Sequence, residues 1–245
     1  LAPRDFVSRS MDQEIKEGRG AGPDADYVLL KLDHLGAETI MKRLPSIREI
    51  AIKFANVDPI TDPIPVVPTA HYQMGGIPSN YHGQVVAPKN GNPSSVVGGL
   101  YAIGECACAS VHGANRLGTN SLLDIVVFGR AAGNHIVASQ LRDRPHKPLP
   151  RDAGDAALAR LARLDASSSG ENSQAVAASI RRAIQTHCGV FRPSELLAAG
   201  VREVMAIARQ VEHLHIADKS QVFNTARVEA LELYNLIEVA KATSV

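Results

Sequence analysis

The stretch that decides the fold runs from Gly99 to Arg130 and reads GLYAIGECACASVHGANRLGTNSLLDIVVFGR. It opens with a short apolar run, Leu100 to Ile103, which is typical of a strand buried on both faces of a sheet. A polar loop with several glycines follows, and an apolar helix is predicted from about Asn120. A strand that leads through such a loop to a helix N-terminus builds a site for an anion.

The loop carries the residue types that an anion site needs. Gly113 and Gly118 allow close backbone approach and a positive φ, and Asn120 or Ser121 is expected to cap the following helix. The planar guanidinium of Arg116 suits a carboxylate or a phosphate. The same pattern also fits a glycine-rich crossover with one surface arginine.

Four strings carry a resemblance to a known family. The segment HGANRLGTNSLLD at 112–124 resembles the signature of the flavoprotein family that comprises succinate dehydrogenase, fumarate reductase and L-aspartate oxidase. Three further strings agree with it: PRD at 3–5, PTAHYQMGG at 68–76 and DKSQVFNTA at 218–226. The resemblance covers essentially the whole chain and is greatest to succinate dehydrogenase.

Composition and charge exclude several classes of protein. The chain has 45% hydrophobic and 21% charged residues, which is ordinary for a globular protein, and its net charge of +1 favours no nucleic-acid partner. Cys106, Cys108 and Cys188 form neither a disulfide framework nor a zinc-ligand pattern, so we expect a reducing compartment and no metal. No run of about 18 apolar residues predicts a membrane span.

The first two of three parts mix helices and strands. Residues 1–66 predict a helix, a strand and two further helices separated at Pro45, the second with a capping box at Ser46–Glu49. Residues 67–140 predict short strands, a turn-rich hairpin or loop at 87–98, the signature loop and a helix that runs to Ser139.

The third part, residues 141–245, is predicted to be helical after a proline-containing linker at 142–150. Apolar residues recur at helical spacing, as expected for a bundle. The predicted helices are 155–164, 174–187, 194–214 and 220–242.

The resemblance implies an α/β plus α fold. Residues 1–66 then correspond to the C-terminal half of a capping domain, 67–140 to the returning half of a Rossmann-type FAD-binding domain, and 141–245 to a helical domain. The family's dinucleotide fingerprint, its histidine for covalent flavin attachment and part of its substrate-binding set have no counterpart in the sequence. We therefore expect an internal to C-terminal portion of a longer parent, inactive alone.

The resemblance also implies a cofactor and site residues. Oxidation of succinate removes a hydride from one carbon and a proton from its neighbour, and FAD is the expected electron acceptor. Arg4 is the implied proton-transfer residue, and His71 and Arg116 are implied to bind a substrate carboxylate. The implied FAD contacts are Glu105, Ser121 and Leu122.

Each residue also has a plainer interpretation from sequence alone. Arg4 can be simply a charged residue at a helix start, since a guanidinium stays protonated. His71 can be a hydrogen-bonded loop histidine, and Glu105 can be a buried partner of Arg130. His112 fits either a ligand contact or an internal hydrogen bond.

The expected function is that of the flavoprotein subunit of succinate dehydrogenase, which oxidises succinate to fumarate and passes electrons to an iron–sulfur subunit and quinone. Fumarate reductase, L-aspartate oxidase and a non-catalytic fragment with an interaction role are the alternatives. Membrane anchor subunits are implied partners. The implied location is peripheral, at the cytoplasmic face of a bacterial inner membrane or the matrix face of the mitochondrial inner membrane.

Overall fold

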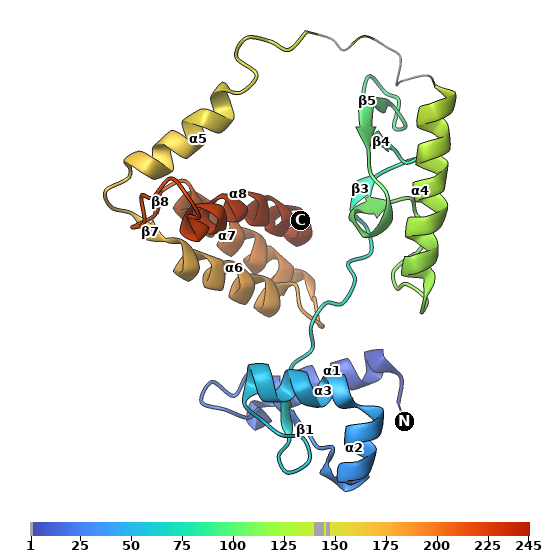
Figure 1. Ribbon diagram of the computed structural model, residues 1–245, viewed down its shortest axis with the longest axis vertical. Coiled ribbons are helices and arrows are strands. Elements are labelled where there is room, and N and C mark those ends of the chain that lie inside the picture. The colour runs from blue at the N-terminus through green and yellow to red at the C-terminus, as the bar shows by residue number, and fades with distance from the viewer. Residues whose placement is uncertain (1, 140–144, 146–147) are drawn as a thin grey trace. The chain divides into compact units, whose positions relative to one another are not determined.

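The computed structural model describes residues 2–139, 145 and 148–245. About 52% of the described residues are helical, and the described strands pair in two-stranded sheets. The chain divides into two compact units: residues up to Pro68 join Pro150–Val245 in one, and Thr69–Leu149 form the other. Figure 1 labels the helices and strands. The predicted linker at 142–150 falls mostly outside the described residues.

The N-terminal part of the first unit alternates short helices with one strand pair. Strands β1 and β2 are antiparallel. The elements are α1 (Arg4–Glu14), a π-helical turn (Ile15–Arg19), β1 (Val28–Leu30), a 3-10 turn (Asp33–Leu35), α2 (Ala37–Arg43), α3 (Pro45–Ile50), a second π-helical turn (Ala51–Ala55) and β2 (Ile64–Val66).

The break between α2 and α3 was predicted correctly, but its capping box was not. Pro45 is the first residue of α3, where its missing N–H costs no hydrogen bond. Leu44 is therefore the N-cap residue, and no side chain caps the helix. Ser46 already lies inside α3, so it cannot act as the predicted cap.

The unit Thr69–Leu149 joins two strand pairs to one long helix. Strands β4 and β5 are antiparallel, which agrees with the hairpin alternative predicted for 87–98, and β3 and β6 are parallel. The elements are β3 (Ile77–Pro78), β4 (Gln84–Val86), β5 (Val96–Tyr101), a 3-10 turn (Gly104–Cys106), β6 (Ala107–Cys108) and α4 (Asn120–Ala138).

The predicted doubly buried strand is wrong for this chain. Strand β5 ends at Tyr101, and Leu100 is 51% exposed. Among the described strands only β4 pairs with β5, so the two-stranded sheet has too few neighbours to cover both of its faces. The buried core here is small and comprises Val85, Ala102 and Ala107.

The C-terminal part is a helical bundle, as predicted. Helices α6, α7 and α8 pack around apolar side chains that include Ile180, Val204 and Leu233. The elements are α5 (Asp155–Ala166), β7 (Glu171–Asn172), α6 (Ser173–His187), α7 (Ser194–Val211), β8 (Leu214–His215) and α8 (Thr225–Ser244).

Asparagine caps set two helix starts in this bundle. Asn172 and Asn224 each accept a hydrogen bond from a backbone N–H in the first turn of α6 and α8. Helix α8 therefore starts later than the predicted residue 220. Val222 consequently lies outside the helix and is 69% exposed.

Candidate functional site

The signature loop is fixed closely against α4 where it leaves β5. Gly104 is buried with φ of +70°, and a Cβ at this position would come within 2.6 Å of the side chain of Ile125. Glycine is therefore required by both the backbone conformation and the space. Glu105 follows directly, and its side chain is exposed.

The segment that contains His71 is joined to the same loop through the parallel pair β3 and β6. Gly76 has φ of +115°, and a Cβ there would lie 2.5 Å from the carbonyl oxygen of Cys106. Any other residue would separate the two segments. The string at 68–76 thus lies beside the signature loop.

Tyr72, His112 and Asp124 meet around one buried carboxylate; we call them the Asp124 cluster. Nε2 of His112 lies 2.9 Å from Oδ2 of Asp124, and the Tyr72 hydroxyl donates to the same oxygen at 3.3 Å. The side chains of His112 and Asp124 are only 9% and 6% exposed. Both donors meet one oxygen of the buried carboxylate, so the three residues form one connected group.

Arg116 lies on the ring of Tyr72. Its guanidinium carbon is 4.8 Å from the ring centroid, which is within range of a cation–π interaction, and its Nη1 donates to the Leu117 carbonyl at 2.9 Å. None of the ion pairs among the described residues includes Arg116. A half-buried guanidinium without a carboxylate partner is suited to binding an anionic ligand.

The charge of Asp124 also acts on Tyr72. Burial raises the pKa of the Tyr72 hydroxyl above its ordinary value of 10.0, and the negative charge of Asp124 raises that pKa further. The phenol therefore stays protonated at neutral pH and serves as a hydrogen-bond donor.

The two predicted substrate-binding residues belong to this one unit. His71 directly precedes Tyr72 and is exposed, whereas Arg116 is half-buried on the Tyr72 ring. Arg4 is the exposed first residue of α1 in the other compact unit. The strings of His71 and Arg116 therefore lie together within one unit, and Arg4 belongs to the other unit.

The predicted FAD contacts lie at the ends of β5 and α4. Ser121 and Leu122 are in the first turn of α4, and Leu122 is 66% exposed. The expected cap at Asn120 or Ser121 is wrong, because Thr119 occupies the N-cap position with φ of +67° and no side chain caps the helix. The positive end of the helix dipole is consequently not neutralised by a side-chain cap.

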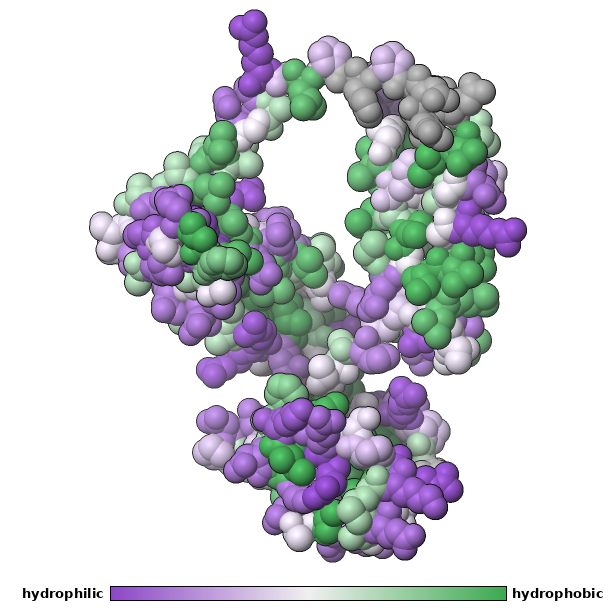
Figure 2. Space-filling model, in the orientation of Figure 1, coloured by the Kyte–Doolittle hydropathy of each residue, from purple (hydrophilic) through white to green (hydrophobic). Residues whose placement is uncertain are grey.

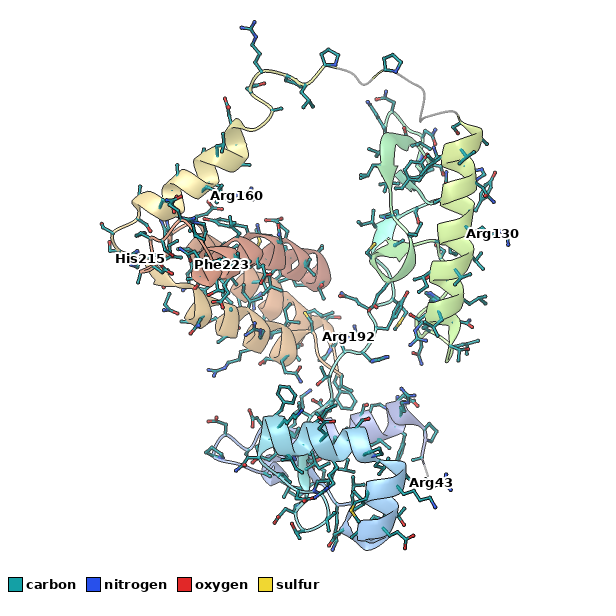
Figure 3. All side chains as sticks on the ribbon, in the orientation of Figure 1. Arg43, Arg130, Arg160, Arg192, His215 and Phe223 are labelled. Carbon is teal, nitrogen blue, oxygen red and sulfur yellow. The ribbon has the colours of Figure 1, made fainter. Side chains whose placement is uncertain are left out.

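The alternative role of Glu105 as a buried partner of Arg130 is wrong. Glu105 is exposed, and Arg130 projects from the side of α4 turned away from β4 and β5 (Figure 3). His112, whose role the sequence left open, makes an internal hydrogen bond to Asp124.

Sequence reasoning missed Tyr72 and Asp124. A signal for Asp124 was present, because it is the one charged residue in the otherwise apolar run from Ser121 to Phe128. A carboxylate within such a run is buried only when it is paired. Nothing local marks Tyr72 as its partner, since 52 residues separate the two.

Two family models match this chain. The family described as FAD binding domain matches residues 1–122, and the family described as fumarate reductase flavoprotein C-term matches residues 177–245. The succinate dehydrogenase flavoprotein subunit of Coxiella burnetii is 48% identical over 242 residues. The chain belongs to the succinate dehydrogenase/fumarate reductase flavoprotein family.

This flavoprotein chain aligns along nearly its whole length with part of each relative. The C. burnetii match covers 99% of this chain and 41% of the relative. The mitochondrial succinate dehydrogenase flavoprotein subunit of Oryza sativa is 48% identical over 97% of this chain and 38% of its own length. The chain thus spans about two fifths of the length of these relatives.

Solved structures of the same family share its fold. A chain of Escherichia coli quinol fumarate reductase aligns with a TM-score of 0.78 and 35% identity, over 99% of this chain and 40% of the other. The Mycobacterium smegmatis Sdh1 complex contains a chain with a TM-score of 0.77 and 32% identity, over 100% of this flavoprotein chain and 39% of that chain.

The described residues contain no group of three or more histidine, cysteine or acidic side chains placed to hold a metal ion. No described helix is long and apolar enough to cross a membrane.

Proposed function

We propose that this chain forms part of the flavoprotein subunit of succinate dehydrogenase and contributes to the oxidation of succinate to fumarate. The observation that carries the proposal is the placement of Arg116, free of any carboxylate partner among the described residues, on Tyr72 beside the string of His71. The 48% identity to relatives named as this subunit supports it.

Arg116 and His71 would bind the substrate. A guanidinium offers two parallel N–H donors to one carboxylate, and the ring of Tyr72 limits how the guanidinium can turn. His71 is exposed on the neighbouring segment and would donate a hydrogen bond to a substrate carboxylate. A dicarboxylate therefore meets two separate groups in this unit.

Arg4 would transfer the proton. Its position in the string Pro3-Arg4-Asp5 matches the family motif, and its side chain is exposed. A guanidinium ordinarily stays protonated, so an arginine in this role must be placed where it can pass a proton on. The proposal therefore requires that Arg4 meet the substrate in the complete protein.

The residues at the ends of β5 and α4 fit a flavin. Gly76 and Gly104 have positive φ and leave no room for a Cβ, so the backbone of both segments comes close together. Glu105 and Leu122 are exposed, and no side chain caps the N-terminus of α4. Glu105, Ser121 and Leu122 would hold FAD, which when bound supplies the hydride acceptor.

The amides at the start of α4 would also influence that chemistry. The N-terminus of a helix carries a partial positive charge. Preorganised donors at the position where negative charge develops lower the barrier of the reaction. Ser121 and Leu122 would supply such donors through their backbone.

We also propose the three-part domain assignment: 1–66 as half of a capping domain, 67–140 as half of the FAD domain and 141–245 as a helical domain. Exposed apolar side chains on α4 support the assignment, because they indicate that another part of the parent protein packs on this helix. Figure 2 shows the hydrophobic surface over α4. The remaining part of an FAD domain would cover it. These side chains are Leu122, Leu123, Ile125, Val126, Val127 and Val137.

Expression of residues 1–245 alone tests this assignment. The uncovered α4 surface should bind an apolar dye, and the fragment should carry no covalent flavin and no succinate dehydrogenase activity. Stoichiometric flavin with succinate-dependent dye reduction by the fragment would contradict the assignment.

The partners follow from the relatives. We propose an iron–sulfur subunit and membrane anchor subunits, with the chain peripheral to the membrane at the cytoplasmic face in a bacterium or the matrix face in a mitochondrion. Related chains come from quinol fumarate reductase and from an Sdh1 complex with UQ1, which supports assembly with a quinone-reactive complex.

Substrate specificity distinguishes the candidate functions. The intact subunit that carries this sequence should reduce an artificial electron acceptor with succinate and not with L-aspartate. Activity with L-aspartate alone would favour L-aspartate oxidase, and activity with neither would favour the non-catalytic alternative. Comparison of succinate oxidation with fumarate reduction, using a donor of low potential, measures the preferred direction.

A further inference from the structure

The carboxylate of Asp124 is buried in α4 and holds two side chains at once. Oδ2 lies 2.9 Å from Nε2 of His112 and 3.3 Å from the hydroxyl of Tyr72. A buried carboxylate is costly unless its hydrogen-bonding capacity is filled, so the two donors and the carboxylate stabilise one another. Helix α4 thus anchors both the signature loop and the 68–76 segment.

These contacts fix the ring of Tyr72 at two places. Asp124 holds the hydroxyl, and the imidazole of His112 meets the ring at 5.4 Å between centroids with an interplanar angle of 81°. The Tyr72 ring therefore has little freedom to turn, and the Arg116 guanidinium packs on it at 4.8 Å in a cation–π contact. The Asp124 cluster therefore sets the orientation of the Arg116 guanidinium through its contact with the Tyr72 ring.

We propose that Asp124 and His112 are positioning residues for substrate binding, which act by fixing Tyr72 as the platform on which Arg116 receives a carboxylate of the substrate. The proposal rests on the proposed function. It assigns no substrate contact to Asp124 or His112, whose side chains are buried.

A direct contact between His112 and a ligand is the competing interpretation. Nδ1 of His112 is buried and has no partner among the described residues. Protein atoms cover it, so a ligand could reach it only after the loop moved. Positioning through Tyr72 requires no such movement, because every contact it needs is already formed.

Binding of malonate, a non-reacting dicarboxylate, to the intact subunit by isothermal calorimetry tests the proposal. Asp124→Asn and Tyr72→Leu should each weaken malonate binding about tenfold, and Tyr72→Phe, which keeps the ring, should weaken it less. Steady-state kinetics should give a larger change in KM for succinate than in kcat.

Tyr101→Phe is the matched control. The Tyr101 hydroxyl likewise bonds a side chain on α4, with 2.9 Å to Nδ1 of His135. The contacts described above for Arg116 are with Tyr72 and Leu117 and do not include Tyr101. This variant should bind malonate within twofold of the unsubstituted subunit. FAD content and the melting temperature of each variant identify any that fail to fold, and Tyr72→Phe provides the mildest change.

A double-mutant cycle separates positioning from general destabilisation. If the cluster acts through Arg116, then Tyr72→Leu should have little further effect in an Arg116→Lys background. Additive losses, or unchanged malonate affinity in folded Asp124→Asn and Tyr72→Leu, would overturn the inference and leave the proposed function intact. Failure of the unsubstituted subunit to bind malonate would overturn both.

Discussion

The guanidinium of Arg116 lies 4.8 Å from the centroid of the Tyr72 ring, although 44 residues separate the two in the sequence. The contact joins the segment 68–76 to the signature loop. Each of the two segments carries a residue proposed to bind substrate, His71 in the first and Arg116 in the second. A cation on an aromatic face keeps its N–H donors available in the plane of the guanidinium. Nη1 donates to the Leu117 carbonyl and Nε is buried, so the remaining N–H groups of Nη1 and Nη2 are the ones left for a carboxylate.

Replacement of Arg116 by lysine should weaken malonate or succinate binding by about 2 kcal/mol, because an ammonium group cannot make the paired N–H contacts of a guanidinium. The inhibition constant for malonate measures the loss. Arg130→Lys, an exposed position on α4, is the control and should leave it unchanged. An unchanged constant in Arg116→Lys would mean that Arg116 is only structural.

Replacement of His71 by alanine should also weaken dicarboxylate binding, because the substrate would lose one of its two contacts. A monocarboxylate that lacks the second charge should lose less affinity than malonate does. Competition assays with both inhibitors measure the difference. Equal weakening of the two would argue against binding of one carboxylate by each residue.

Replacement of Ile180 by alanine should lower the free energy of unfolding of the helical bundle by about 2–5 kcal/mol, because it leaves a cavity between α6, α7 and α8. Leu158→Ala on α5, where the side chain is 63% exposed, should have little effect. Urea unfolding followed by circular dichroism compares the two variants. Similar losses would contradict the proposed location of the core.

Alkaline titration tests the environment of Tyr72. Its pKa is raised in the folded state, so the stabilisation that it contributes is complete below its ordinary pKa of 10.0 and declines as pH rises toward the folded-state value. Ultraviolet titration of the five tyrosines should include a late component that Tyr72→Phe removes. Loss of an early component in Tyr72→Phe would contradict the burial described here.

Helices were the part of the fold that sequence predicted well. Apolar residues at helical spacing gave both ends of α6 and the start of α4 to within about one residue. The starts and ends that were wrong depend on single local interactions, such as the Asn224 cap at α8 and Pro45 at α3. Several residues compete for such positions, and periodicity does not choose among them.

The candidate site was predicted only in its outline. The motif identified Arg116 and His71, because their strings resemble a family signature. It did not identify the contacts of Tyr72 with Arg116 and Asp124, which depend on how the chain folds back through β3 and β6. The sequence also failed to predict that Leu100 is exposed. An apolar run predicts that its side chains are buried, but it does not identify the segment that would cover them.

The most direct test of the account is single-turnover reduction of the bound flavin by succinate in the intact subunit. The unsubstituted subunit should lose its oxidised flavin absorbance on mixing with succinate, and Arg9→Gln, an exposed substitution on the same helix, should behave alike. Arg4→Gln should keep its FAD and its malonate binding but lose succinate-dependent reduction, because proton transfer is needed in the transition state. Reduction by Arg4→Gln within about tenfold of the unsubstituted rate would contradict the proposed role of Arg4, and no reduction of the unsubstituted subunit by succinate would contradict the proposed function itself.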